Sequence, residues 1–256
     1  MIKRIALLGG LLLAGCAQVV VDDGARKLDP RAAARDRVAI AAKYIQQNED
    51  DNALKYLQQA LKSDPDSAEA HNLLAVVMER DRNVKAADRE FRKALRLRDN
   101  YSQAHNNYGS FLFRQGRYKD ALKQYEAAAE DITYAFRAQA FEGMARCAWQ
   151  LGDVARTEDA LQRALGLDPN LPGAMLLAAE FNYNKQNYDA ARNLYRRFLQ
   201  LTTAMPQSPQ SLWLGIRLER RFGDKDALAS YELALKRLYP ASPEYQQYLQ
   251  SLGTNK

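Results

Sequence analysis

A repeat of 34 residues runs through most of this 256-residue chain. Four columns of residues share the spacing: two of alanine, one of alanine or glycine, and one of large side chains. They are Ala53, Ala87 and Ala121; Ala60, Ala94 and Ala128; Ala41, Ala75 and Gly109; and Leu57, Phe91 and Tyr125. A period of this length indicates a stack of similar supersecondary units, each of which contacts mainly its neighbours.

The composition favours helices over strands. The chain has 41 alanines and 34 leucines, which are strong helix formers. Valine, isoleucine and threonine total only 19, few for a sheet-rich fold. Because 47% of the residues are hydrophobic, the chain can bury enough apolar surface to fold. We therefore expect an all-α protein.

A 34-residue period with small and aromatic residues in these columns resembles the tetratricopeptide repeat. This resemblance implies a right-handed superhelical solenoid of six helical hairpins over residues 30–256. Small residues allow two helices to approach closely, and the large residue fills the gap to the next hairpin. We expect the hairpins to begin near Ala34, Ala68, Ser102, Ala138, Pro172 and Ser208, and a short capping helix over residues 243–252.

The first residues are typical of a lipoprotein signal peptide, which we assign to residues 1–15. Lys3 and Arg4 precede an apolar stretch over residues 5–13 that is too short to span a bilayer. The stretch ends in Leu-Ala-Gly-Cys, which resembles a bacterial lipobox and implies an acylated Cys16 followed by a tether over residues 16–29. Ala17 rather than aspartate after the cysteine favours the periplasmic face of the outer membrane. An ordinary secretory signal and a buried N-terminal helix are the alternatives.

The sequence contains none of the common motifs for phosphate, dinucleotide or zinc binding. The only two histidines, His71 and His105, lie 34 residues apart, which favours a packing role in consecutive repeats over a catalytic or metal-binding one. We therefore expect no enzyme activity, cofactor, metal or small-molecule substrate. The net charge of +6 is small and scattered, and an exported protein is a poor partner for nucleic acid.

The first helix of each hairpin is expected to line a concave groove. The candidate partner-binding residues on these helices are Val38, Ile45, Asn72, Val76, Asn106, Ser110, Phe113 and Trp149. They favour a groove that takes an amphipathic or extended peptide through apolar contacts. Packing between neighbouring hairpins is an equally open interpretation for each of them. A clamp for peptide carboxylates is disfavoured, since Val38 and Ala42 stand where its first lysine and asparagine would be.

Three segments resemble the type IV pilus biogenesis and stability lipoproteins of the PilF/PilW type. They are Asn106-Asn107-Tyr108-Gly109 with Gly116-Arg117-Tyr118; Leu214-Gly215-Ile216-Arg217-Leu218; and residues 235–240 with Glu244-Tyr245. The resemblance implies a pilotin, a lipoprotein that binds the pilus secretin subunit and other pilus assembly proteins. It would promote outer-membrane localisation and multimerisation of the secretin, and so pilus biogenesis and twitching motility. Only Cys16 is carried over as a site residue.

A second hypothesis remains open. Helical-repeat lipoproteins also serve as scaffolds for outer-membrane protein assembly or for recruitment of cell-wall hydrolases. Such assembly factors usually have five degenerate units, whereas this chain has six with regular columns.

Overall fold

A computed structural model describes residues 29–253, and in this part of the chain all regular elements are helices. The thirteen helices of this part are α1 (Pro30–Gln46), α2 (Asp50–Ser63), α3 (Ala68–Arg80), α4 (Val84–Leu97), α5 (Ser102–Arg114), α6 (Tyr118–Glu130), α7 (Arg137–Gln150), α8 (Val154–Leu167), α9 (Pro172–Asn184), α10 (Tyr188–Leu201), α11 (Pro209–Phe222), α12 (Lys225–Leu238) and α13 (Pro243–Gly253). The signal peptide, Cys16 and the tether up to residue 28 lie outside the described residues.

Consecutive helices pair into six hairpins, and α13 packs against α11. The prediction of an all-α solenoid of tetratricopeptide-type hairpins is confirmed. The first helix, α1, begins at Pro30, where the Asp29 side chain accepts a hydrogen bond from the Arg31 amide and so caps the helix. Proline also stands in the first turn of α9 and of α11, where a missing amide donor costs nothing.

Each hairpin reverses through one residue in the left-handed backbone region. These residues are Asn48, Arg82, Gly116, Gly152, Gln186 and Gly223. At the first five tips the amide of the residue that follows donates to a carbonyl five positions earlier in the chain, as when the Arg117 amide after Gly116 donates to the Leu112 carbonyl. Carbonyls at the end of the first helix are thereby satisfied, and the chain turns sharply into the second helix. Glycine at three of the six tips meets this backbone requirement at no steric cost.

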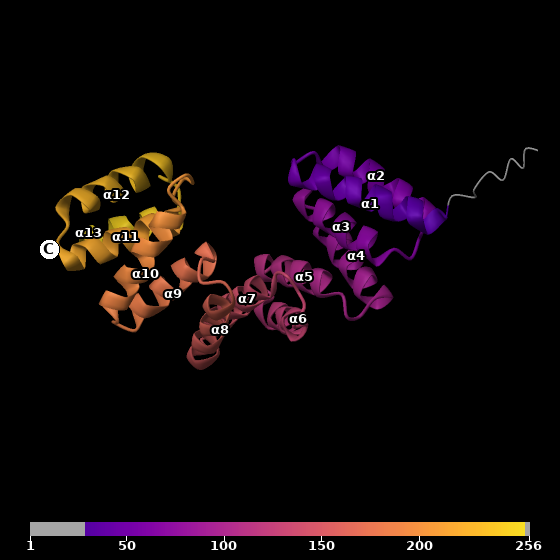
Figure 1. Cartoon of the computed structure of the whole chain (residues 1–256). Coiled ribbons are helices and arrows are strands. Elements are labelled where there is room, and N and C mark those ends of the chain that lie inside the picture. The colour runs from indigo at the N-terminus through magenta and orange to yellow at the C-terminus, as the bar shows by residue number, and fades with distance from the viewer. Residues whose placement is uncertain (1–28, 254–256) are drawn as a thin grey trace, which may run out of the picture.

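The hairpins stack side by side into an open crescent, with α1 and α2 at one end and α12 and α13 at the other (Figure 1). In the middle of the crescent, α5 and α7 lie on the inner side, and α6 and α8 lie on the outer side (Figure 1). First helices of neighbouring hairpins contact one another along the whole array, from α1 with α3 to α11 with α13. The array therefore presents one continuous row of first helices.

The large column residues form the core between the hairpins. Leu57 and Phe91 are fully buried, and Tyr125 is 6% exposed. The Phe91 ring on α4 packs 5.3 Å from the Tyr108 ring on α5, measured between centroids, and so joins the second hairpin to the third. The alanines of the other columns are fully buried where helices cross. A long core without a single centre follows from this nearest-neighbour packing.

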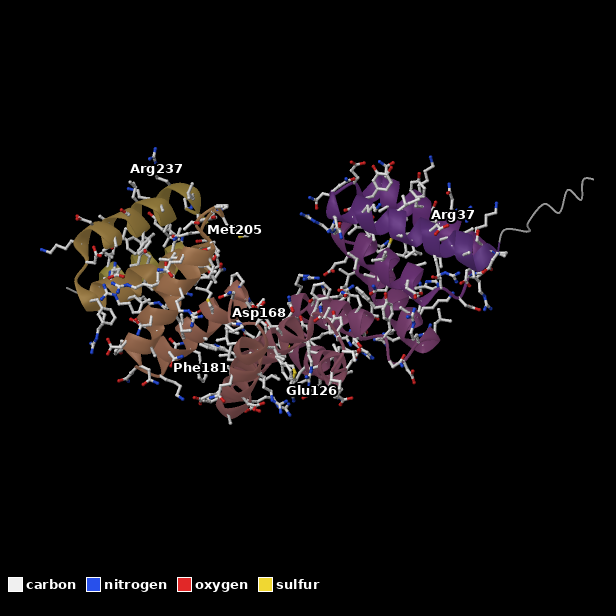
Figure 2. The ribbon with its side chains drawn as sticks, in the orientation of Figure 1. Arg37, Glu126, Asp168, Phe181, Met205 and Arg237 are labelled. Atoms are coloured by element: carbon white, nitrogen blue, oxygen red, sulfur yellow. The ribbon has the colours of Figure 1, made fainter. Side chains whose placement is uncertain are left out.

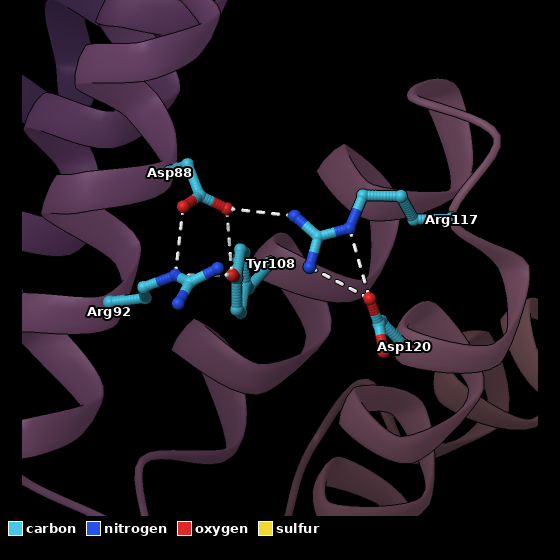
Figure 3. Close-up of polar contacts among 5 residues, drawn as sticks. All are labelled: Asp88, Arg92, Tyr108, Arg117 and Asp120. Carbon is cyan, nitrogen blue, oxygen red and sulfur yellow. Dashed lines mark hydrogen bonds and ion pairs between the residues drawn. The ribbon is translucent and has the colours of Figure 1, made fainter.

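A polar network joins the second and third hairpins outside the core (Figure 3). Asp88 on α4 accepts a hydrogen bond of 2.9 Å from the Tyr108 hydroxyl and pairs with Arg92 at 2.8 Å and with Arg117 at 3.2 Å. Arg117 also pairs with Asp120 at 2.7 Å. Burial, and then the hydrogen bond to Asp88, raise the pKa of Tyr108. The network fixes the stagger between these two hairpins.

Figure 2 shows Arg237 of α12 pointing away from the helices. Met205, 64% exposed, lies in the connection between α10 and α11. Over residues 29–253, no helix has both the length and the apolar character needed to span a bilayer.

Candidate functional site

Three hollows follow the row of first helices. The first, the N-terminal groove, has a volume of about 360 Å³ and lies between α1, α3 and α5. Its lining consists of Arg35, Val38, Ala39, Ala42, Ser67, Glu69, Asn72, Leu73, Tyr101, Gln103 and Asn107. Apolar side chains of α1 and α3 form most of its surface. The groove therefore suits an apolar segment.

Hydrogen bonds hold the polar rim of the N-terminal groove in place. Asn107 on α5 donates to the Asn72 side chain on α3 at 3.2 Å, and Arg98 pairs with Glu69. Burial alone would raise the pKa of Glu69. The hydrogen bond from Arg98 and its charge outweigh burial and keep this pKa below its usual range. Arg98 also lies over the Tyr101 ring, 4.3 Å from its centroid. The groove therefore has fixed walls, which lowers the ordering cost of binding.

The middle hollow, also about 360 Å³, lies between α5, α6 and α7. Asn106 and Ser110 of α5 line it, and the Ser110 hydroxyl is hydrogen-bonded to the Tyr125 hydroxyl at 2.9 Å. Burial raises the pKa of Tyr125 to about 12. Phe113 and Arg146 line both this hollow and the next one, so the two are adjacent.

The C-terminal groove is the largest of the three, at about 570 Å³. It lies between α5, α7, α9, α11 and α13. Its lining consists of Phe113, Arg146, Trp149, Gln150, Leu177, Glu180, Asn184, Gln210, Trp213, Glu244 and Gln247. The capping helix α13 therefore supplies one wall of the groove as well as covering the last hairpin.

Aromatic rings and ion pairs build the walls of the C-terminal groove. The edge of the Trp149 ring packs against Phe181, with the centroids 5.4 Å apart. Arg217 pairs with Glu180 at 2.9 Å and lies over the Trp213 ring, 5.4 Å from its centroid. These contacts keep both tryptophans in defined positions.

The predicted groove residues fall into different hollows. Val38 and Asn72 line the N-terminal groove, Asn106 and Ser110 line the middle hollow, and Phe113 and Trp149 line the C-terminal groove. Two residues differ from the prediction. Ile45 is 8% exposed and packs in the core of the first hairpin with Ala41 and Leu57, because it lies on the face of α1 that meets α2. Val76 packs, partly buried, between the cores of the first hairpins.

Sequence reasoning missed the contribution of α11 and α13 to the groove. Trp213 on α11 and Glu244 and Gln247 on α13 complete the C-terminal groove. The chain has only two tryptophans, and this rarity is a signal in the sequence that could have pointed to Trp213. The inward position of Glu244 depends on how α13 folds back, which the repeat pattern does not specify.

The two histidines make packing contacts within the array. His71 contacts Glu90 at 2.7 Å and the Pro65 carbonyl at 3.0 Å. His105 makes the equivalent contacts, with Gln124 at 2.8 Å and the Asp99 carbonyl at 2.7 Å. Over residues 29–253, no three histidine, cysteine or acidic side chains group in a way that could hold a metal ion.

Cys147 is fully buried in the core. Burial, together with the nearby Glu126 charge, raises the pKa of its thiol to about 12. The thiol therefore stays protonated at neutral pH and is a poor nucleophile.

Comparisons with known proteins agree with this architecture. The chain matches the TPR repeat family over residues 42–81 and the tetratricopeptide repeat family over residues 80–135 and 142–211. It is 38% identical over 219 residues to the type IV pilus assembly protein PilF of Pseudomonas aeruginosa, which covers 85% of this chain and 86% of that protein. A solved structure of P. aeruginosa PilF matches with a TM-score of 0.78 at 36% identity, covering 87% of this chain and 99% of that one.

The crystal structure of PilW, a type IV pilus biogenesis factor, matches with a TM-score of 0.71 at 24% identity. It covers 84% of this chain and 98% of that one. At this identity the match supports the fold alone.

Proposed function

Since the chain belongs to the PilF/PilW family of tetratricopeptide-repeat proteins of type IV pilus assembly, we propose that it is a secretin pilotin. In this proposal it is a non-enzymatic outer-membrane lipoprotein on the periplasmic face. It binds subunits of the pilus secretin and promotes their localisation and multimerisation. The observation that carries the proposal is the 38% identity to PilF over 85% of the chain.

The proposed mechanism combines a lipid anchor with recognition. Acyl chains on Cys16 hold the protein at the membrane, with about 0.8 kcal/mol of membrane affinity for each buried CH₂ group. Residues 17–29 reach at most about 45 Å when fully extended, which keeps a bound secretin subunit close to the bilayer. Confinement near the membrane raises the local concentration of subunits and favours ring assembly. No covalent step is needed.

A deletion strain tests the function. We expect it to lose heat-stable secretin multimers and twitching motility, while porin levels stay normal. Re-expression of the wild-type chain should restore both. Normal secretin multimers in the deletion strain would rule the pilotin out, and reduced porin levels would favour the scaffold for outer-membrane protein assembly.

The anchor has a separate test in the variant Cys16→Ser, which cannot be acylated. We expect this variant to be lost from the outer-membrane fraction. Outer-membrane fractionation equal to that of the wild type would contradict the anchor.

The N-terminal groove is the proposed secretin-binding surface, because it combines apolar walls with a fixed polar rim. Ala39 and Ile40 are neighbouring exposed residues of α1, but only Ala39 lines the groove. Ala39→Glu should reduce secretin multimers in the complemented strain, and Ile40→Glu should not. Equal effects of the two variants would place the secretin elsewhere on the molecule.

A further inference from the structure

The C-terminal groove has the size and composition of a binding site distinct from the N-terminal groove. Its volume of about 570 Å³ falls within the range of about 300–1,000 Å³ that is usual for ligand pockets. It is built on α5, α7, α9, α11 and α13, whereas the N-terminal groove is built on α1, α3 and α5, and no residue lines both. Two different segments could therefore bind the array at once.

Carboxamide side chains suit the groove to a polypeptide backbone. Three exposed residues, Gln150, Asn184 and Gln247, line it. Their side chains make no hydrogen bond to any other residue among those described. Each carboxamide carries both a donor and an acceptor and can pair with the N–H and C=O groups of an extended chain. Trp149 and Phe113 also line the groove and offer apolar contacts to side chains of that chain. An extended peptide presents backbone groups and side chains in turn, so it can use both kinds of contact.

The charge of the groove points to a basic occupant. Arg146 is paired with Glu142 at 2.7 Å, and Glu180 is paired with Arg217, so these charges are compensated. Within residues 29–253, Glu244 has no cationic partner. One of its carboxylate oxygens accepts from Gln210 at 2.8 Å, and the other, Oε2, is buried and has no hydrogen-bond partner among these residues. A buried carboxylate oxygen without a donor is costly, and an arriving ammonium or guanidinium group would satisfy it.

We propose that the C-terminal groove binds an extended basic segment of a partner protein. A lysine or arginine of that segment pairs with Glu244, the neighbouring apolar side chain packs on Trp149, and the carboxamides hold the backbone. The array is then bivalent, with a second partner segment on the C-terminal groove beside whatever occupies the N-terminal groove. The proposal does not depend on the pilotin function.

The position of the tryptophans makes occupancy directly measurable. The chain has only two tryptophans, Trp149 and Trp213, and both line this groove. Neither tryptophan lines the N-terminal groove or the middle hollow, so intrinsic tryptophan fluorescence of the full chain distinguishes binding in the C-terminal groove from binding in those two. The probes are two capped heptapeptides, one of alternating leucine and lysine and one in which glutamate replaces each lysine.

We expect a saturable change in tryptophan emission with the basic peptide, and at least about tenfold weaker binding of the acidic peptide. Glu244→Gln, which keeps the shape of the side chain, should weaken binding of the basic peptide about tenfold, as loss of one charge-assisted contact does. Glu130→Gln is the matched control, because Glu130 is exposed on α6 and lines none of the three hollows. It should leave both affinities unchanged.

Three results would overturn the proposal. They are equal affinities for the two peptides, an unchanged affinity in Glu244→Gln, and a fluorescence response that never saturates. The circular dichroism spectrum and the melting temperature of each variant show that it is folded, so that weakened binding is assigned to the groove.

Discussion

Two glycines flank a single tyrosine ring between the third and fourth hairpins. Tyr125 on α6 is 6% exposed, and its ring lies against Gly109 of α5 and Gly143 of α7. A Cβ atom built on Gly143 would lie 2.4 Å from the ring, whereas one on Gly109 would lie 3.0 Å away. Because carbon atoms pack at about 3.5–4.0 Å, Gly143→Ala requires the ring to move by about 1 Å.

The expected cost follows from what the ring would lose. Overpacking of a well-packed site costs about 1–3 kcal/mol. Movement of the ring also weakens the 2.9 Å hydrogen bond between the Tyr125 and Ser110 hydroxyls, which contributes about 1 kcal/mol. The higher helix propensity of alanine relative to glycine offsets about 1 kcal/mol of this cost. We therefore expect Gly143→Ala to lower the free energy of unfolding by about 1–3 kcal/mol.

Urea unfolding followed by circular dichroism measures this change. Gly166→Ala on α8 is the matched control, because nothing lies within 4 Å of its added Cβ, and it should stabilise the protein by up to about 1 kcal/mol. In a Tyr125→Leu background the shorter side chain should remove most of the penalty at Gly143. The reasoning is refuted if Gly143→Ala is as stable as the wild type, or if its cost is the same with leucine at position 125.

Three further predictions concern buried polar groups. Tyr108→Phe removes a hydrogen bond to Asp88 and should lower the free energy of unfolding in urea by about 1–2 kcal/mol. Tyr188→Phe is the control, because the Tyr188 hydroxyl has no hydrogen bond within residues 29–253, and it should change this free energy by less than about 0.5 kcal/mol. In the 17–256 form, the single thiol of Cys147 should resist iodoacetamide at pH 8 until urea unfolds the protein, and rapid alkylation of the folded form would contradict the burial. The raised pKa of Cys147, about 12 in the folded state against 9.0 for a free thiol, means that the unfolded state loses its proton first. The free energy of unfolding should therefore fall as pH rises above about 9, and Cys147→Ala should flatten that fall between pH 9 and pH 10.

The repeat period was sufficient to predict the hairpins, since it places small residues where helices cross and large ones between hairpins. The column of Ala41, Ala75 and Gly109 continues at Ala145, since the fourth unit begins 36 residues after the third. Gly109 and Gly143 both lie where the ring of Tyr125 occupies the space of a side chain. A period of this kind reports packing because each unit meets the same neighbour.

The binding surfaces were less predictable, because they combine residues that are distant in the sequence. Phe113 and Gln247 line one groove although they are 134 residues apart. Ile45 packs in the core rather than in a groove, and the sequence leaves both interpretations open because it does not show which face of α1 meets α2. The unpaired carboxylate oxygen of Glu244 depends on the return of α13 against α11, which lies outside the repeat pattern.

Direct capture of the secretin tests the central claim of the account. The soluble 17–256 form, immobilised through its C-terminus, is incubated with a detergent extract of the outer membrane from a strain that lacks the chromosomal copy. The account predicts that the pilus secretin is retained, and that the Ala39→Glu form retains much less of it than the Ile40→Glu form does. Absence of the secretin from the material bound to the wild-type form, with the immobilised protein folded, would contradict the account.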